Sequence, residues 1–185
     1  MAIWTLQTGS DFTAFRFLDE VDKVYFEELV KNYFDEFKMV SRQLRPLHML
    51  RTEPKKHPDF FEIEDTDVIA ISQNAVDALQ PFLKKIELLL IITDAGNYYA
   101  MNVLCFVDCI EKNKSEYVST SDGTIVTYTS LEFDKNKVKG YSIFRIPQLP
   151  YKIFVSSDIE DICEQEELKG LEFDPEANMV WAPNI

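Results

Sequence analysis

Apolar residues in the first 40 positions change from strand-like to helical spacing. Alternation of apolar and polar residues over 3–6, a polar break over 8–11 and a second apolar stretch over 12–17 predict two short strands around a turn. From Asp22 to Phe37 the apolar residues instead recur at helical intervals, with charged residues between them. This spacing predicts an amphipathic helix.

The next segment is rich in proline and then gives way to a strand and a helix. Pro46, Pro54 and Pro58 predict a loop-rich connector, because proline withholds a backbone donor and restricts the residue before it. Residues 68–71 are continuously apolar, as in a buried strand, and Ser72 stands where a helix N-cap belongs. The buried face of the following helix is predicted to carry Ala75, Val76, Leu79 and Leu83.

Most of the second half of the chain has the pattern of strands. The apolar run over 88–92, a turn over 94–97 and the apolar stretch over 98–107 predict two strands joined by a turn. β-Branched and aromatic residues predict further strands over 125–129 and 131–133.

The order of strand, serine and helix recurs near the end of the chain. Residues 153–155 are predicted to form a strand, and Ser156 and Ser157 to cap a helix. Ser157 and Glu160 have the spacing of a capping box, in which each side chain bonds to the backbone of the other residue. Gly170 is predicted to end the helix.

These elements predict an α+β fold with a mainly antiparallel or mixed sheet and a few flanking helices. A chain of 185 residues with 46% apolar residues can bury a substantial core, so we expect a single domain over 1–185.

The formal net charge is −13, from 32 acidic and 19 basic side chains. Such a field opposes binding to phosphate backbones, so we expect no nucleic-acid ligand. The same field would accelerate encounter with a basic partner, although acidity that only maintains solubility is an open alternative.

Carboxylates are concentrated at the predicted C-terminal helix. Six of them lie between positions 158 and 167, with no lysine or arginine among them: Asp158, Glu160, Asp161, Glu164, Glu166 and Glu167. The first three would favour the helix through the positive end of its dipole. The last three lie beyond that influence, so we predict that this segment binds a partner, with a solvated helix face as the alternative.

The sequence carries no phosphate-binding glycine loop, GxSxG elbow or HExxH helix. Cys105 and Cys109 could form a zinc site with His48 and His57, but a CxxxC spacing with distant histidines is weak support for one. We therefore expect no catalytic residue, no metal and no cofactor, and we expect Cys105, Cys109 and Cys163 to act as small buried apolar residues. An enzyme that uses an unrecognised cysteine or carboxylate pair stays open as an alternative.

We expect a cytoplasmic protein without a membrane partner. The longest apolar run, over 88–92, is far shorter than the roughly 20 residues that a membrane-spanning helix needs. The first residues lack the basic start, apolar stretch and cleavage site of a secretory signal. An odd number of cysteines without disulfide spacing fits a reducing compartment.

Short stretches between positions 59 and 174 occur in an order shared with a known family. They are Asp59-Phe60, Ile71-Ser72, Leu79–Leu83, Tyr98–Val103, Asp108, Lys114-Ser115, Phe133-Asp134, Ile143–Arg145, Ile153–Ser156 and Gly170–Phe173. In this order they resemble the immunity proteins encoded beside polymorphic or contact-dependent toxins in bacteria. We therefore divide the domain into a divergent N-terminal part (1–58), an immunity-protein-like part (59–174) and a C-terminal tail (175–185).

The resemblance implies a non-catalytic protein that binds and neutralises a cognate toxin, and from the net charge we expect that toxin to present a basic surface. It implies no catalytic residues. Arg145 is expected to bond to an internal partner, although contact with the toxin is the alternative. A housekeeping protein-interaction module and an enzyme with an unrecognised site are the competing hypotheses.

Overall fold

The largest sheet of the molecule has six strands in the order β3-β4-β7-β8-β6-β5. The computed structural model describes residues 2–9, 12, 14–40, 45–52, 57–173 and 180–181. The strands are β3 (Phe15–Phe17), β4 (Leu47–Arg51), β5 (Phe60–Glu62), β6 (Ile69–Ser72), β7 (Ile86–Thr93) and β8 (Gly96–Val103). All neighbours run antiparallel except β4 and β7, which are parallel.

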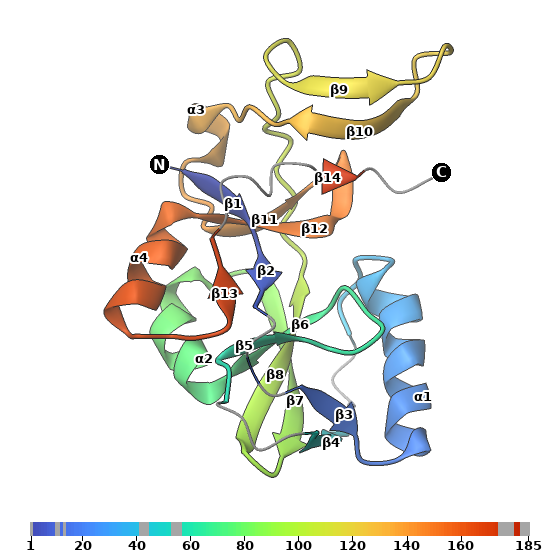
Figure 1. Cartoon of the computed structure of the whole chain (residues 1–185), viewed down its shortest axis with the longest axis vertical. Coiled ribbons are helices and arrows are strands. Elements are labelled where there is room, and N and C mark those ends of the chain that lie inside the picture. Colours follow the sequence, from blue (N-terminus) through green and yellow to red (C-terminus); the bar gives the residue numbers. More distant parts are fainter. Residues whose placement is uncertain are drawn as a thin grey trace.

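Both faces of this sheet are covered, which explains why its central strands are apolar throughout. Side chains alternate between the two faces of a strand. Ile69 and Ile71 of β6 therefore enter one core, and Ala70 between them enters the other. The first core includes residues of α2 (Gln73–Leu79) and α4 (Ser157–Gln165), and the second includes residues of α1 (Glu20–Leu29). Figure 1 shows α1 on the opposite side of the sheet from α2 and α4.

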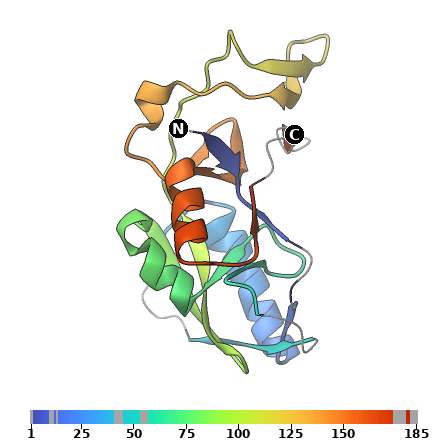
Figure 2. The ribbon, with the colours of Figure 1, turned by 60° about the vertical axis from the view of Figure 1, so that its left-hand side comes forward.

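Three smaller sheets complete the fold. Their strands are β1 (Ile3–Thr5), β2 (Gln7–Thr8), β9 (Glu116–Ser119), β10 (Ile125–Ser130), β11 (Ile143–Ile146), β12 (Leu149–Ser156), β13 (Leu171–Glu172) and β14 (Val180–Trp181). They pair in the orders β1-β12-β11, β14-β10-β9 and β13-β2. The β9–β10 hairpin projects from one end of the molecule in both views (Figures 1 and 2).

The remaining helical segments are short. They are a π-helical turn that extends α1 (η1, Val30–Phe34), a 3-10 turn (η2, Gln80–Phe82) and α3 (Lys135–Val138). The prediction of an α+β fold with a mixed sheet and flanking helices is confirmed. Among the described residues, no helix is long and apolar enough to cross a membrane.

The N-terminal strands and helix form as predicted, but the strands do not pair with each other. β1 pairs with β12, and β3 pairs with β4. The predicted helix begins earlier, at Glu20, because Asp19 caps it by accepting a hydrogen bond from the Asp22 amide at 2.8 Å. Ser10 and Asp11 of the predicted turn lie outside the described residues.

The prediction of a loop-rich connector around the prolines is wrong at its centre. β4 begins directly after Pro46 and lies inside the main sheet between β3 and β7. Proline excludes strand pairing only where its missing donor is needed, and Pro46 stands outside the strand. Pro54 lies outside the described residues.

The predicted central units are present, but α2 ends at Leu79, so Leu83 lies beyond it after η2, and β8 ends at Val103, before residue 107. Ser72 caps α2 by accepting a hydrogen bond from the Ala75 amide at 3.1 Å. β7 and β8 form a hairpin across a turn at Asp94, and Gly96 adopts a φ of 122° there. The strand predicted over 131–133 is present only as an isolated bridge between Phe133 and Ile110.

Two predicted signals at the C-terminal helix are wrong. The N-cap is Ser156, so Ser157 is the first residue of α4 and forms no capping box with Glu160. Glu167, not Gly170, takes the left-handed conformation that closes the helix, with a φ of 52°. The Leu168 amide then donates to the Cys163 carbonyl at 2.9 Å, as in a Schellman motif.

Gly170 has a different role from the predicted one. Its φ is 102°, and a Cβ atom there would lie 2.2 Å from the carbonyl oxygen of Phe60. Glycine is therefore required because the backbone of β5 approaches too closely for any side chain.

Candidate partner-binding surface

The acidic segment forms the outer face of α4. Ile159 and Cys163 point into the core, whereas Asp158, Asp161 and Glu164 are exposed. The alternation follows helical spacing, so the buried apolar residues fix which carboxylates face solvent.

Two of the predicted partner-binding residues make contacts within the protein. Glu160 is half-buried and accepts a hydrogen bond from the indole N–H of Trp4 at 2.9 Å, which links α4 to β1. Asp158 accepts hydrogen bonds from the hydroxyls of Ser142 at 3.3 Å and Ser156 at 3.2 Å. Glu160 thus has a structural role, whereas Asp158 is bonded and still exposed.

The other end of the segment borders an open groove of about 990 Å³. Glu166 and Glu167 line one side of this groove, and Gln73, Asn74 and Asp77 of α2 line another. Figure 2 shows α2 and α4 side by side. The fold therefore adds Asp77 to the acidic segment, although no local sequence pattern links residues so far apart.

A network centred on Asp59 holds the base of this groove. One carboxylate oxygen of Asp59 accepts from the Ser72 hydroxyl at 2.6 Å, and the other accepts from the Lys169 amide at 2.9 Å. The Asp59 amide donates to the Lys169 carbonyl at 2.6 Å. Asp59 thus joins the start of α2 to the segment that follows α4, which places Glu166 and Glu167 opposite α2.

The carboxylates of α4 have no lysine or arginine ion-pair partner among the described residues. In the part of the chain that the structure describes, no lysine or arginine forms an ion pair with any of the six predicted residues. We define the α4 acidic surface as its exposed members, Asp158, Asp161, Glu164, Glu166 and Glu167. Solvated carboxylates in this arrangement can attract and contact a basic protein surface.

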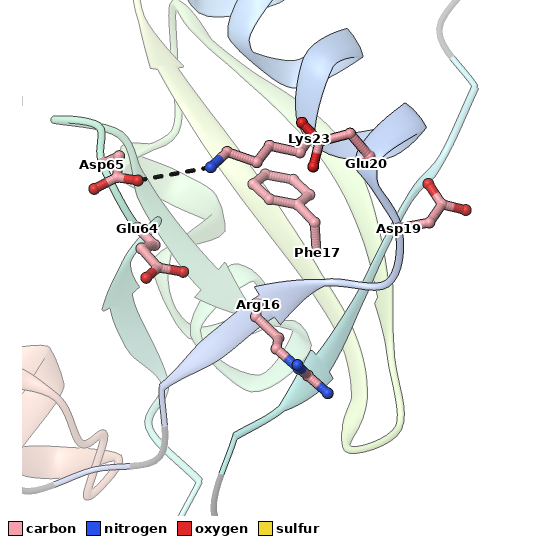
Figure 3. A pocket seen from close by; sticks show the side chains of 7 residues that line it. All are labelled: Arg16, Phe17, Asp19, Glu20, Lys23, Glu64 and Asp65. Carbon is pink, nitrogen blue, oxygen red and sulfur yellow. Dashed lines mark ion pairs between the residues drawn. The ribbon is translucent and has the colours of Figure 1, made fainter.

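A second, smaller cavity of about 210 Å³ lies between α1, β3 and the loop after β5 (Figure 3). The Lys23 side chain forms a 3.9 Å ion pair with Asp65. Arg16 points away from Glu64 and Asp65 in the same view. Lys23 therefore pairs with a carboxylate of this cavity and Arg16 diverges from two others, so we assign no ligand to it.

The three cysteines occupy apolar interiors. All are buried and unpaired. Burial raises the pKa of the Cys105 thiol. It raises the pKa of Cys109 to about 11 and the pKa of Cys163 to about 12, so the thiols stay protonated at neutral pH. Within the described ranges, no three His, Cys, Asp or Glu side chains are grouped as a metal site would require. The zinc and cysteine-nucleophile hypotheses gain no support.

Arg145 has an internal role. Its side chain is buried and donates to the carbonyl oxygens of Val103 at 3.2 Å and Pro150 at 2.6 Å. The predicted internal position is therefore found, but the guanidinium bonds to backbone carbonyls and not to a carboxylate.

The structure also brings together three aromatic residues that the sequence does not connect. Phe37 lies after η1, Phe106 lies after β8, and Tyr151 belongs to β12. We predicted Phe37 as part of the apolar face of the N-terminal helix, where helical spacing places it. Because the helix ends before Phe37, its ring points elsewhere.

Residues 92–178 match the model of the Imm11 immunity protein family. The match covers a little less than half of the chain and extends from the end of β7 past β13, so it includes α4. No curated protein matches the chain. The resemblance to immunity proteins is confirmed for this region, whereas its extension over 59–91 stays a prediction. The family implies toxin neutralisation, and such proteins are typically non-catalytic.

Proposed function

Because this chain carries an Imm11 immunity protein region, we propose that it neutralises its cognate toxin through contact between the α4 acidic surface and a basic face of the toxin. One observation carries the proposal. Five exposed carboxylates lie on or directly after α4, inside the matched region, without an ion pair to any described lysine or arginine.

Charge complementarity would act mainly on the rate of association. Steered protein pairs associate at about 10⁸ to 10⁹ M⁻¹s⁻¹ at low salt, against about 10⁵ to 10⁶ M⁻¹s⁻¹ without steering. A fast rate suits an immunity protein, because the toxin must be bound before it acts. The free thiols fit action in the reducing cytoplasm of the cell that makes both proteins.

The test uses the toxin-like gene beside the gene for this chain. A heterologous bacterium expressing that toxin should grow only when this protein is co-expressed, and the two proteins should co-purify. Reversing the charges of Glu164, Glu166 and Glu167 to lysine should slow association by about tenfold or more at low salt.

A matched control distinguishes the effect of the α4 acidic surface from the effect of the net charge. Lysine substitutions at Glu20, Glu27 and Glu28, all exposed on α1, change the net charge equally and should slow association much less. Growth rescue distinguishes neutralisation from a housekeeping interaction module. Absence of rescue and of a complex would refute the proposal for this pair, and equal effects of the two triple variants would refute the α4 surface as the contact.

A further inference from the structure

Three aromatic side chains, the exposed Phe106 and Tyr151 and the half-buried Phe37, form a cluster beside the end of η1. The Phe37 ring centroid lies 4.9 Å from that of Phe106 and 5.8 Å from that of Tyr151. Phe106 is 37% exposed and Tyr151 is 39% exposed, so much of both rings is open to solvent. We call these three residues the aromatic patch.

The backbone at Phe37 adopts a conformation that a large side chain rarely takes. Its φ is 51°, and its amide donates to the Phe34 carbonyl at 3.2 Å as the helix ends. Glycine or asparagine usually fills such a position, and another residue costs about 1–2 kcal/mol. The end of the helix alone would favour glycine, so the ring of Phe37 must contribute contacts that offset this strain.

The base of the patch is rigid. The Arg145 guanidinium lies 5.4 Å from the Phe37 ring centroid and is fixed by its bonds to the carbonyls of Val103 and Pro150. The segment after Phe37 is also tethered, because the Asn102 amide donates to the Lys38 carbonyl at 2.9 Å and to Glu87 at 3.0 Å. Rigid aromatic groups lose little conformational entropy on binding and are frequent among the residues that dominate interface affinity.

The surroundings of Arg145, which lies against Phe37, are acidic, because burial lowers the pKa of Arg145 to about 10 whereas the nearby charges of Asp67 and Asp35 raise it. Partial burial raises the pKa of Asp35, and the charge of Asp67 raises it further. Partial burial and the same Asp67 charge raise the pKa of Glu62. Among the described residues none of these three carboxylates forms an ion pair, although Arg145 and Lys152 attract them from a distance. A cation placed here would relieve the repulsion and could also lie over an aromatic face.

The patch lies within reach of the α4 acidic surface. Tyr151 is near the start of β12, and α4 begins directly after this strand ends at Ser156. Six residues of strand span about 20 Å. An interface of ordinary size, about 800 Å² on each partner, can therefore extend from the patch to the start of α4, where Asp158 of the acidic surface lies.

We infer that the aromatic patch is the affinity anchor for the cognate toxin, receiving an apolar side chain beside a lysine or arginine. This inference rests on the proposed neutralisation. The α4 acidic surface would set the association rate, and the aromatic patch would set the lifetime of the complex.

The test compares two exposed tyrosines. Tyr151→Ala removes a ring of the patch, whereas Tyr117→Ala removes a ring that is 47% exposed on the β9–β10 hairpin, which projects from the end of the molecule. With the purified neighbouring toxin, Tyr151→Ala should raise Kd by about tenfold or more, mainly through faster dissociation. Tyr117→Ala should stay within about twofold of wild type.

Phe106→Ala provides an independent variant of the patch and should weaken binding similarly. Unfolding midpoints identify any variant that has lost its fold, and the other variant then decides. If the wild type binds the toxin and both patch variants bind it as tightly as the wild type, the aromatic patch is not the affinity anchor, and the proposed neutralisation is unaffected. If the wild type does not bind the toxin, both the anchor and the proposed function are wrong.

Discussion

Asp22 shows how one buried carboxylate can hold two distant segments together. It lies in the first turn of α1 and is almost fully buried. It accepts hydrogen bonds from the Arg45 side chain and from the His48 amide at 2.8 Å, which ties the helix to β4. Burial by itself raises the pKa of Asp22, but the hydrogen bonds from Arg45 and His48 outweigh it and hold the pKa below the ordinary value of an aspartate.

Asp22→Asn should therefore lower the free energy of unfolding by about 2 kcal/mol at neutral pH, because hydrogen bonds to a charged group contribute about 1.5–3 kcal/mol. A depressed pKa contributes stability that is complete above the unfolded-state value and disappears as the pH falls through the folded-state value. The difference between variant and wild type should consequently shrink as the pH falls below the ordinary pKa of an aspartate and through the lowered pKa of Asp22. Urea denaturation at a series of pH values measures it.

Asp94→Asn is the matched control for this carboxylate. Asp94 accepts from the Arg51 side chain at 2.8 Å, and that bond lowers its pKa, but the pair is exposed to solvent. Because solvent screens the exposed pair, Asp94→Asn should lower the free energy of unfolding much less than Asp22→Asn does. Equal losses, or a constant Asp22→Asn difference at every pH, would contradict the stated role of burial.

At the scale of elements, two serines precede helices in the same way but do different work. The Ser72 hydroxyl accepts from the Ala75 amide and donates to Asp59, so it caps α2 and anchors the groove. The Ser156 side chain makes no capping hydrogen bond, and its hydroxyl donates only to Asp158 at 3.2 Å. Although the two sequences are similar, the Ser72 side chain therefore stabilises the N-terminus of its helix more than the Ser156 side chain does.

Ser72→Ala should lower the free energy of unfolding by about 2 kcal/mol, because it removes an N-cap and leaves a carboxylate oxygen of Asp59 without its donor. Ser156→Ala should cost less than about 1 kcal/mol, since only a bond to an exposed carboxylate is lost. Chemical denaturation of the two variants side by side checks this order. A larger loss for Ser156→Ala would show that the hydrogen bonds do not determine the strength of these caps.

The elements that sequence could predict are those fixed by local patterns. Ser72 with its helix and the β7–β8 hairpin each depend on residues close in sequence, and both form as expected. β4 was missed because its place in the sheet depends on pairing with β7, about 40 residues away along the chain. The close approach that requires Gly170 depends on β5, which is equally invisible to local spacing.

The residues of the candidate surface also fall into those that local sequence could predict and those that depend on distant parts of the chain. The exposed carboxylates of α4 could be predicted, because a helix with a buried apolar face must present its remaining residues to solvent. The contact between Glu160 and Trp4 could not, since 156 positions separate them. The aromatic patch was missed because its three rings come from three separate segments, and one of them occupies a backbone conformation that helical spacing does not predict.

On the scale of the whole molecule, charge and aromatic contact should affect different steps of toxin binding. The electrostatic field of the net charge of −13 is screened over the Debye length, which falls from about 30 Å at 0.01 M to about 3 Å at 1 M ionic strength. Aromatic contacts act only after the surfaces meet, so salt should change them little. The two contributions can thus be separated by measuring association and dissociation rates independently.

Raising the ionic strength from about 10 mM to about 1 M should slow association of the wild type with its toxin by about tenfold or more, while dissociation changes less. Reversal of Glu164, Glu166 and Glu167 should flatten this salt dependence, because three of the five carboxylates of the α4 acidic surface then repel a basic partner. Tyr151→Ala should keep the full salt dependence of the association rate and show faster dissociation at every salt concentration. Stopped-flow mixing measures the first rate, and competition with excess unlabelled protein measures the second. If salt leaves the association rate unchanged, the acidity of the chain serves solubility and not encounter.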